Sequence, residues 1–162
     1  MKSKNVFALI IIFIILFSGC QNKEINVYNA NGLARDENGS PIFPEKYIGL
    51  SVYGKNGEEI IYEMFIDFDY KKDISVADLS KDMCRELNIP IVFAGMGSLV
   101  YVQGINGLFE FDYGAESGWL YAVNGEFQGI GCGDYVLKNR DYVEWYYTLD
   151  LGKDVGNDFG IK

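Results

Sequence analysis

The side chains that most often do chemistry in proteins are sparse in this chain of 162 residues. It contains no histidine, so it lacks the usual general base for a serine or cysteine nucleophile. The commonest nitrogen ligand for zinc, copper or nickel is missing for the same reason. The composition therefore argues against a hydrolase and a zinc site, and we expect a protein that is not an enzyme.

Carboxylates near the carboxy terminus are the one group with a possible metal chemistry. Asp150, Asp154 and Asp158 recur at intervals of four around Gly152 and Gly156. Calcium loops of the EF-hand type place their acidic ligands two residues apart instead. We therefore expect a solvated acidic segment and no metal site, with a calcium-dependent structural module as the weakest alternative.

Two cysteines lie in the body of the chain, at Cys84 and Cys132. In an exported protein an even pair is typical of a disulfide, and two buried thiols are the alternative.

The amino terminus has the form of an export signal. Lys2 and Lys4 precede an uninterrupted apolar run, Val6 to Phe17, and small residues follow. Twelve apolar residues would span about 18 Å as a helix, which is well short of the ~30 Å hydrocarbon core of a bilayer. We therefore expect residues 1–19 to be removed.

The segment 16–20, Leu-Phe-Ser-Gly-Cys, resembles the lipobox of bacterial lipoproteins. This resemblance implies cleavage before Cys20, lipidation of that cysteine, and anchoring to the outer face of the bacterial cytoplasmic membrane. An ordinary secreted protein is the alternative.

Net charge limits the partners of the exported part. The full chain carries −9, and removal of residues 1–19 takes away two lysines and no acids, which leaves −11. Nucleic acid and anionic lipid head groups would be repelled by this charge. We therefore expect no nucleic-acid partner, and membrane contact only through the lipid anchor.

Local patterns predict a short tether followed by one domain. Residues 20–44 are rich in polar residues and end near two prolines, which favours a flexible tether, and residues 45–162 would form the domain. Alternating apolar residues on either side of an Asn-Gly turn at 56–57 predict a hairpin. A helix with Ser75 as its amino-terminal cap follows, with apolar residues at spacings of three and four. Short strands are expected at 91–94, 99–103 and 109–113.

Two further strands would contain Trp119 and Trp145, the two tryptophans of the chain, in alternating aromatic runs. The order of strand pair, helix and more strands predicts an α+β fold. A β-grasp-like mixed sheet with one helix packed on one face fits that order.

Many short elements between residues 104 and 156 also carry a family resemblance. They include Gly104-Ile105-Asn106-Gly107-Leu108, Ser117-Gly118-Trp119-Leu120-Tyr121, Val123-Asn124-Gly125, Glu144-Trp145 and Asp150-Leu151-Gly152-Lys153-Asp154. In order and spacing, the chain resembles the bacterial lipoproteins related to the transcobalamin carboxy-terminal domain, the DUF4430 family. The resemblance covers residues 48–156 and implies the same β-grasp fold.

Two details of the chain follow from this resemblance. Relatives often carry four cysteines, and the positions of the missing two imply a retained bridge between Cys84 and Cys132. Arg140 stands where the family usually has glycine before Asp141. Because arginine tolerates a positive φ poorly, we expect that turn to change its type.

The resemblance implies a non-enzymatic ligand-binding module, with cobalamin or another corrinoid as the small-molecule ligand and no certain cofactor. In the carrier proteins this domain closes over cobalamin against a helical barrel that this chain lacks. Apolar and amide groups suit such a flat ligand, and the candidate contacts are Asn124, Phe127, Gln128, Tyr135, Trp119 and Tyr121. Trp119 and Trp145 are expected to be mainly core. The alternative function is a cell-surface domain that binds another exported protein or a glycan.

Overall fold

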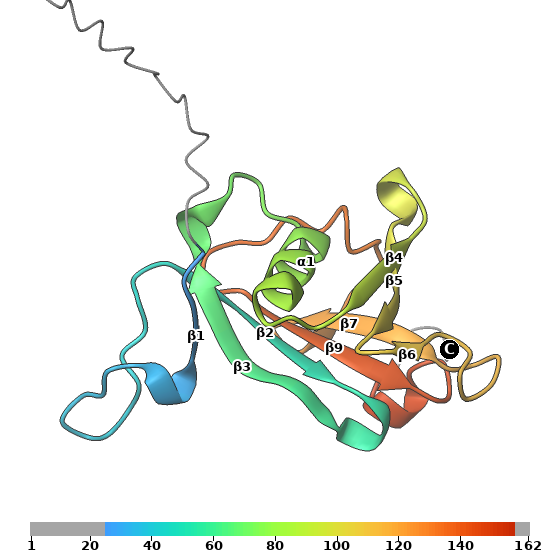
Figure 1. The fold of residues 1–162 in the computed structure, drawn as a ribbon, viewed down its shortest axis with the longest axis horizontal. Helices are drawn as coiled ribbons and strands as arrows, with labels where there is room; N and C mark the ends of the chain where they lie inside the picture. Colours follow the sequence, from blue (N-terminus) through green and yellow to red (C-terminus); the bar gives the residue numbers. More distant parts are fainter. Residues whose placement is uncertain (1–24, 158–162) are drawn as a thin grey trace, which may run out of the picture.

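The computed structural model of this chain describes residues 25–157. A six-stranded mixed sheet forms its centre, and a single α-helix packs on one face of that sheet (Figure 1). The strand order is β1-β3-β2-β9-β7-β8, in which β2 and β9 are parallel and the other neighbours are antiparallel. The predicted α+β class, with one helix on an open mixed sheet, is confirmed.

The strands of this main sheet follow the alternating patterns of the sequence. Their bounds are β1 Val27–Asn29, β2 Tyr47–Tyr53, β3 Glu59–Asp67, β7 Gly118–Val123, β8 Glu126–Phe127 and β9 Tyr142–Thr148. A second sheet has the order β4-β5-β6 and consists of Ile91–Ala94, Tyr101–Ile105 and Leu108–Phe109. The strand expected at 109–113 is therefore shorter and earlier, because the chain turns after Phe109 and Phe111 takes a φ of +66°.

Helix α1, Val76–Glu86, begins at the residue that the sequence indicates. The Ser75 hydroxyl accepts a hydrogen bond from the Asp78 amide at 3.0 Å, and the Asp78 carboxylate accepts one from the Ser75 amide at 3.2 Å. This capping box satisfies two amides that have no partner within the helix. The apolar side of α1, formed by Val76, Leu79 and Met83, is buried against the sheet.

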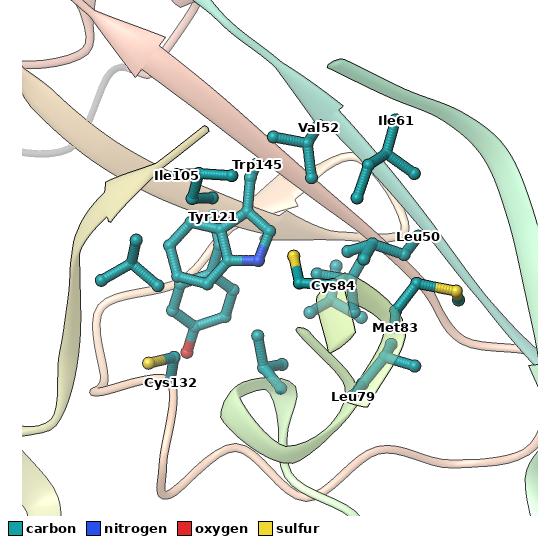
Figure 2. Close-up of a cluster of buried hydrophobic side chains, with 14 of the residues drawn as sticks. Leu50, Val52, Ile61, Leu79, Met83, Cys84, Ile105, Tyr121, Cys132 and Trp145 are labelled. Atoms are coloured by element: carbon teal, nitrogen blue, oxygen red, sulfur yellow. The ribbon is translucent and has the colours of Figure 1, made fainter. Parts of the chain in front are cut away.

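The core lies between α1 and the main sheet (Figure 2). Trp145 of β9 is 2% exposed, and its indole N–H donates to the Ser80 hydroxyl of α1 at 2.8 Å. Alternate residues of β9 point to opposite faces of the sheet, so Val143, Trp145 and Tyr147 enter the core while Tyr146 lies on the face away from α1.

Strand β1 lies inside the segment that the sequence predicts to be tether. Val27 pairs with Ile66 and Asn29 with Met64, so β1 forms the edge of the main sheet beside β3. Farther along, the Phe43 ring stacks on Tyr47 at 4.8 Å. The folded domain therefore begins about twenty residues before the expected boundary.

The turn at Arg140 is the other local correction. Arg140 has a φ of +72°, so the chain keeps the left-handed conformation that glycine would favour. Two contacts hold it there, because the Arg140 amide donates to the Tyr47 carbonyl at 2.7 Å and the Asp141 carboxylate accepts from the Lys138 amide at 2.8 Å. One long-range and one local hydrogen bond thus outweigh the preference of arginine for a negative φ.

No helix within residues 25–157 is long and apolar enough to cross a membrane.

Candidate functional site

A recess of about 170 Å³ lies where the small sheet meets the start of β7, and we call it the β5–β7 recess. Its lining comes from β5, the turn after β6, the first half of β7 and the segment after β9. The side chains that matter for binding are Tyr101, Glu110, Phe111, Trp119, Leu120 and Leu151. The lining therefore combines aromatic and aliphatic side chains with two carboxylates, Glu110 and Glu116.

The Glu110 carboxylate is held in place by neutral donors. Its Oε1 accepts hydrogen bonds from the Tyr101 hydroxyl at 3.0 Å and from the Gln103 amide at 3.2 Å. The hydrogen bond to Glu110 raises the pKa of Tyr101, so the phenol stays a donor at neutral pH. Within the described part of the chain Glu110 joins no ion pair. This carboxylate is oriented for a ligand group that donates a hydrogen bond or carries positive charge.

The aromatic walls of the recess differ in how firmly they are fixed. Trp119 is 8% exposed, its indole N–H donates to the Leu108 carbonyl at 3.0 Å, and its ring meets Tyr147 edge-on at 5.2 Å. Phe111 and Leu151 are each 61% exposed at the rim. The floor is therefore rigid, and the apolar rim is open to a ligand.

The size of the recess limits what it can hold. It has room for roughly five or six waters at ~30 Å³ each and is smaller than the ~300–1,000 Å³ of typical ligand pockets. It can accept a small group whole, or the edge of a larger flat molecule that also covers the rim.

Ser117, a serine in the lining of the recess, is committed to structure. It donates to the Gly114 carbonyl at 2.9 Å, accepts from the Tyr113 amide at 3.1 Å, and lies 3.1 Å from the Tyr147 hydroxyl. This serine therefore fixes the loop that leads into β7 and is not poised as a nucleophile.

A larger hollow of about 410 Å³ lies among Glu45, Lys46, Asp67 and Asp69. Lys46 and Asp69 form an ion pair at 3.0 Å there, and both side chains are more than half exposed. The hollow has four charged side chains and no aromatic wall, so the smaller recess is the better candidate for an amphipathic ligand.

Asn124, a predicted ligand contact, is a structural residue of the β7–β8 turn. Its φ is +53°, its side-chain amide donates to the Asp141 carboxylate at 2.9 Å, and its side-chain oxygen accepts from the Tyr142 amide at 2.9 Å. Both polar ends of this side chain are occupied within the protein.

The other predicted contacts are spread over different surfaces. Phe127 packs on Tyr146 at 5.6 Å, on the sheet face away from α1, and Gln128 donates to the Glu126 carbonyl at 2.7 Å. The Tyr135 ring meets Tyr121 edge-on at 6.3 Å. Of the six predicted contacts, only Trp119 lines the β5–β7 recess.

Tyr121 lies in the core beside Cys132. It is 7% exposed, and its hydroxyl donates to the Ile130 carbonyl at 2.8 Å. Burial raises the pKa of this phenol far above its ordinary range. Tyr121 thus pins the loop after β8 to the sheet.

The two cysteines are free thiols and do not form the predicted bridge. The Ala77 amide, in the first turn of α1, donates to the Cys132 carbonyl at 2.9 Å, whereas Cys84 lies seven residues farther along the helix. Seven residues are about 10 Å of helix, so Cys132 lies beside the first turn of α1 and Cys84 lies two turns farther along. Figure 2 shows the Cys132 side chain near the Tyr121 hydroxyl and Cys84 on the helix.

We expect both thiols to be unreactive in the folded domain. Burial raises the pKa of Cys84 to about 12 and that of Cys132 to about 11, so neither forms a thiolate at pH 8. A thiol-specific reagent such as dithionitrobenzoate should label no thiol in a native domain that starts after Cys20, and two after denaturation.

The same pKa values predict the alkaline behaviour of the domain. Both thiols have a higher pKa in the folded domain than in the unfolded chain. Their contribution to the free energy of unfolding is therefore fully present below about pH 8 and is lost as the pH rises toward 12. Rapid labelling of both thiols at pH 8 in the folded domain would contradict their burial. If no thiol is labelled after denaturation, the predicted disulfide between Cys84 and Cys132 is present after all.

The carboxy-terminal acids are used within the turn that follows β9. Asp154 accepts hydrogen bonds from the Thr148 hydroxyl and, at 2.8 Å, from the Leu149 amide, while Asp150 pairs with Lys153 at 3.1 Å. Partial burial works to raise the pKa of Asp154, but these hydrogen bonds outweigh it and lower that pKa. Residues 25–157 contain no cluster of three metal-ligating side chains, and Asp158, like Cys20, lies outside the described residues.

Residues 81–149 match a family model described as "Domain of unknown function (DUF4430)". This segment is a DUF4430 domain. The assignment expected from the sequence is thereby confirmed. The DUF4430 segment starts within α1 and ends after β9, so it contains every named residue of the recess except Leu151.

Two solved structures are similar to the chain. One is a protein from Ruminococcus gnavus ATCC 29149, provisionally described as a metal binding protein, with 13% identity, coverage of 64% of this chain and 97% of that one, and a TM-score of 0.47. The other is haptocorrin in complex with Cbi, with 17% identity and a TM-score of 0.44, where the match covers 67% of this chain but only 27% of haptocorrin. No curated protein matched the chain.

Sequence reasoning missed most of the recess. Glu110 and Phe111 stand within the DUF4430 segment, but a short acidic and aromatic pair gives no signal of its own. Tyr101 precedes this pair in the chain and Leu151 follows it, and only the folded structure brings the four residues together. Phe111 alternates with Phe109 and Tyr113 in the sequence, and only the structure shows that its ring is exposed.

Proposed function

We propose that this protein is an exported, lipid-anchored binding module without catalytic activity, which captures a soluble amphipathic ligand in the β5–β7 recess. The anchor would be Cys20, on the outer face of the cytoplasmic membrane. A corrinoid such as cobalamin or cobinamide is the first ligand to test, because the sequence resembles the domain that closes over cobalamin in the transcobalamin carriers.

The observation that carries the proposal is the Glu110 carboxylate, oriented by Tyr101 and Gln103 between exposed apolar side chains. A corrinoid is too large for a recess of 170 Å³, so its edge would enter the recess while its face covers Phe111 and Leu151. The amide side chains of a corrinoid could donate to Glu110, and apolar contact would supply most of the affinity.

The test is a titration of the soluble domain with cobalamin and, separately, cobinamide, followed by visible spectroscopy and calorimetry. Phe111→Ala and Glu110→Gln should each weaken binding at least tenfold, which corresponds to about 1.4 kcal/mol. Phe111 is mostly exposed, so its removal should leave the thermal midpoint nearly unchanged.

Phe127→Ala is the matched control, because this ring packs on Tyr146 away from the recess. Its affinity should equal that of the unaltered domain. Weaker binding by the Phe127 variant together with unaffected binding by the Phe111 variant would move the site to the β8 surface. No response to either corrinoid at millimolar concentration would remove this ligand class.

A further inference from the structure

The amino-terminal link between a lipid on Cys20 and the folded domain is short. Only residues 21–26 separate Cys20 from Val27, the first residue of β1. Seven Cα steps span at most about 25 Å when fully extended. The described 133 residues, if compact, have a radius of gyration of roughly 14 Å, which corresponds to a diameter of roughly 36 Å. The link is thus shorter than the domain is wide.

The start of β1 marks one end of the domain. Val27 pairs with Ile66, and the Asn26 amide donates to the Asp67 carboxylate at 3.3 Å, so β1 starts where β3 ends. The chain leaves this end of β3 and soon enters α1 at Val76. The cap of α1 therefore belongs to the same end of the molecule as the start of β1 (Figure 1).

The β4–β5 hairpin reaches the same end. Ser75, the cap of α1, bridges to Val136 in the loop between β8 and β9, and the Cys132 thiol of the same loop lies 3.3 Å from the Val100 carbonyl, next to the hairpin tip. The loop also packs closely on the tip, since a Cβ atom added at Gly131 would lie 2.3 Å from the Ser98 carbonyl oxygen. Figure 1 shows the hairpin tip and the start of β1 both in the upper part of the view.

Two apolar side chains project from this tip, which we define as residues 95–99. Met96 is 86% exposed and Leu99 is 76% exposed, which makes them the most exposed large hydrophobic residues within residues 25–157. Nearby on the same end, Ile130 and Val136 are each about half exposed, at 52% and 51%. Exposed methionine and leucine at a hairpin tip have no packing role within the domain.

Ion pairs at this end of the domain weaken the repulsion between the exported part, whose net charge is −11, and a lipid surface. Lys71 pairs with Asp78, Lys46 with Asp69 at 3.0 Å, and Lys72 lies 3.8 Å from Asp73. These pairs neutralise acids that would otherwise repel phosphate head groups.

We propose that the hairpin tip docks into the bilayer that holds the lipid anchor, with Met96 and Leu99 at the boundary between head groups and acyl chains. This inference rests on the lipidation at Cys20 in the proposed function. Removal of these two apolar side chains from water favours this position, and the anchor holds the tip at high local concentration. A tether of 25 residues could span about 85 Å and would impose no such orientation.

This orientation keeps the side of the β5–β7 recess that lies after β9 away from the bilayer. Because β2 and β9 are parallel and β2 starts beside Asp67, β9 ends at Thr148, far from the start of β1. Thr148 and Leu151 line the recess. The Thr148 and Leu151 side of the recess thus faces away from the membrane, whereas Tyr101, two residues after Leu99, marks the side nearest the hairpin tip.

The test uses the full chain, made with its own signal sequence, purified in detergent and reconstituted into phosphatidylcholine vesicles with or without brominated acyl chains. Bromine quenches only indole rings that reach the acyl region. In Met96→Trp, the added emission should fall at least twofold in brominated vesicles. The native Trp119 and Trp145 are 8% and 2% exposed and provide a constant background, measured in the unaltered protein.

Leu151→Trp is the matched control, because this residue is 61% exposed but lies at the recess. It should be quenched no more than the unaltered protein. Circular dichroism of both variants checks the fold.

Two failures can be told apart by vesicle flotation and by the mass of the amino-terminal peptide. The docked tip is overturned, and the anchor left intact, if the lipidated Met96→Trp chain floats with the vesicles but its added indole is not quenched. Equal quenching of the Met96→Trp and Leu151→Trp variants has the same meaning. A chain without lipid that does not float overturns the anchor and the docked tip together.

Discussion

Trp145→Ala is expected to lower the free energy of unfolding by about 3–5 kcal/mol. Trp145 is 2% exposed, contacts Tyr121 at 5.3 Å, and joins the sheet to α1 through its hydrogen bond to Ser80. Its removal leaves a large cavity between the two layers, which a rigid sheet cannot close. Since small domains have about 5–15 kcal/mol of stability, this single change approaches the whole margin.

The measurement is urea denaturation followed by far-UV circular dichroism, because the variant loses a fluorophore. Ser80→Ala separates the hydrogen bond from the packing. It leaves the buried indole N–H without its partner and should cost about 1–3 kcal/mol. Phe111→Ala, at an exposed ring, should change the stability by no more than about 0.5 kcal/mol. A Trp145 variant as stable as this control would show that the core is not organised around the indole.

Asn124→Ala is expected to lower the free energy of unfolding by about 2–4 kcal/mol. Alanine at a φ of +53° costs roughly 1–2 kcal/mol, and two hydrogen bonds, one of them to the Asp141 carboxylate, are lost at roughly 1 kcal/mol each. Asp141 is 8% exposed, so its carboxylate would lose a donor in a place that water reaches poorly.

Asn106→Ala provides the matched control for this prediction. Asn106 has the same φ of +53° in the Asn-Gly turn between β5 and β6, but its side chain is exposed and has no assigned hydrogen bond in the described structure. Its substitution should cost only the conformational part, about 1–2 kcal/mol. The difference between the two variants, measured by urea denaturation, gives the contribution of the side-chain hydrogen bonds. Equal losses would mean that Asn124 is free to contact a ligand, as the sequence suggested.

The sequence located the elements whose pattern is local. Ser75 and Asp78 defined the start of α1, and the alternating residues around Trp119 and Trp145 defined β7 and β9. Each of these signals lies within about ten consecutive residues, and each side chain's burial follows from the period of its own element. Neither signal needs knowledge of a partner far along the chain.

The same local patterns also decided which aromatic residues would be core. Trp119 and Trp145 were expected to be mainly buried, and they are 8% and 2% exposed. The exclusion of histidine-dependent chemistry rests on composition alone, so it remains a prediction about activity.

Tertiary structure alone decided where the domain begins and where the cysteines lie. Three residues, Val27–Asn29, are too few for a periodic signal, and they form a strand only because the edge of β3 offers hydrogen-bonding groups. Cys84 and Cys132 are both free thiols in the core, with Cys132 beside the first turn of α1 and Cys84 two turns farther along the helix. Arg140 keeps a positive φ because of a hydrogen bond to Tyr47, which is 93 residues away.

The candidate site is likewise a product of long-range contacts. Tyr101 and Glu110 meet through a hydrogen bond across the small sheet, while Trp119 and Leu151 arrive from the main sheet and the segment after it. A recess is defined by the surfaces that two sheets leave uncovered, and sequence periodicity records only which residues are buried. The sequence by itself therefore determined the elements and their core faces, whereas the packing of the two sheets decided the site.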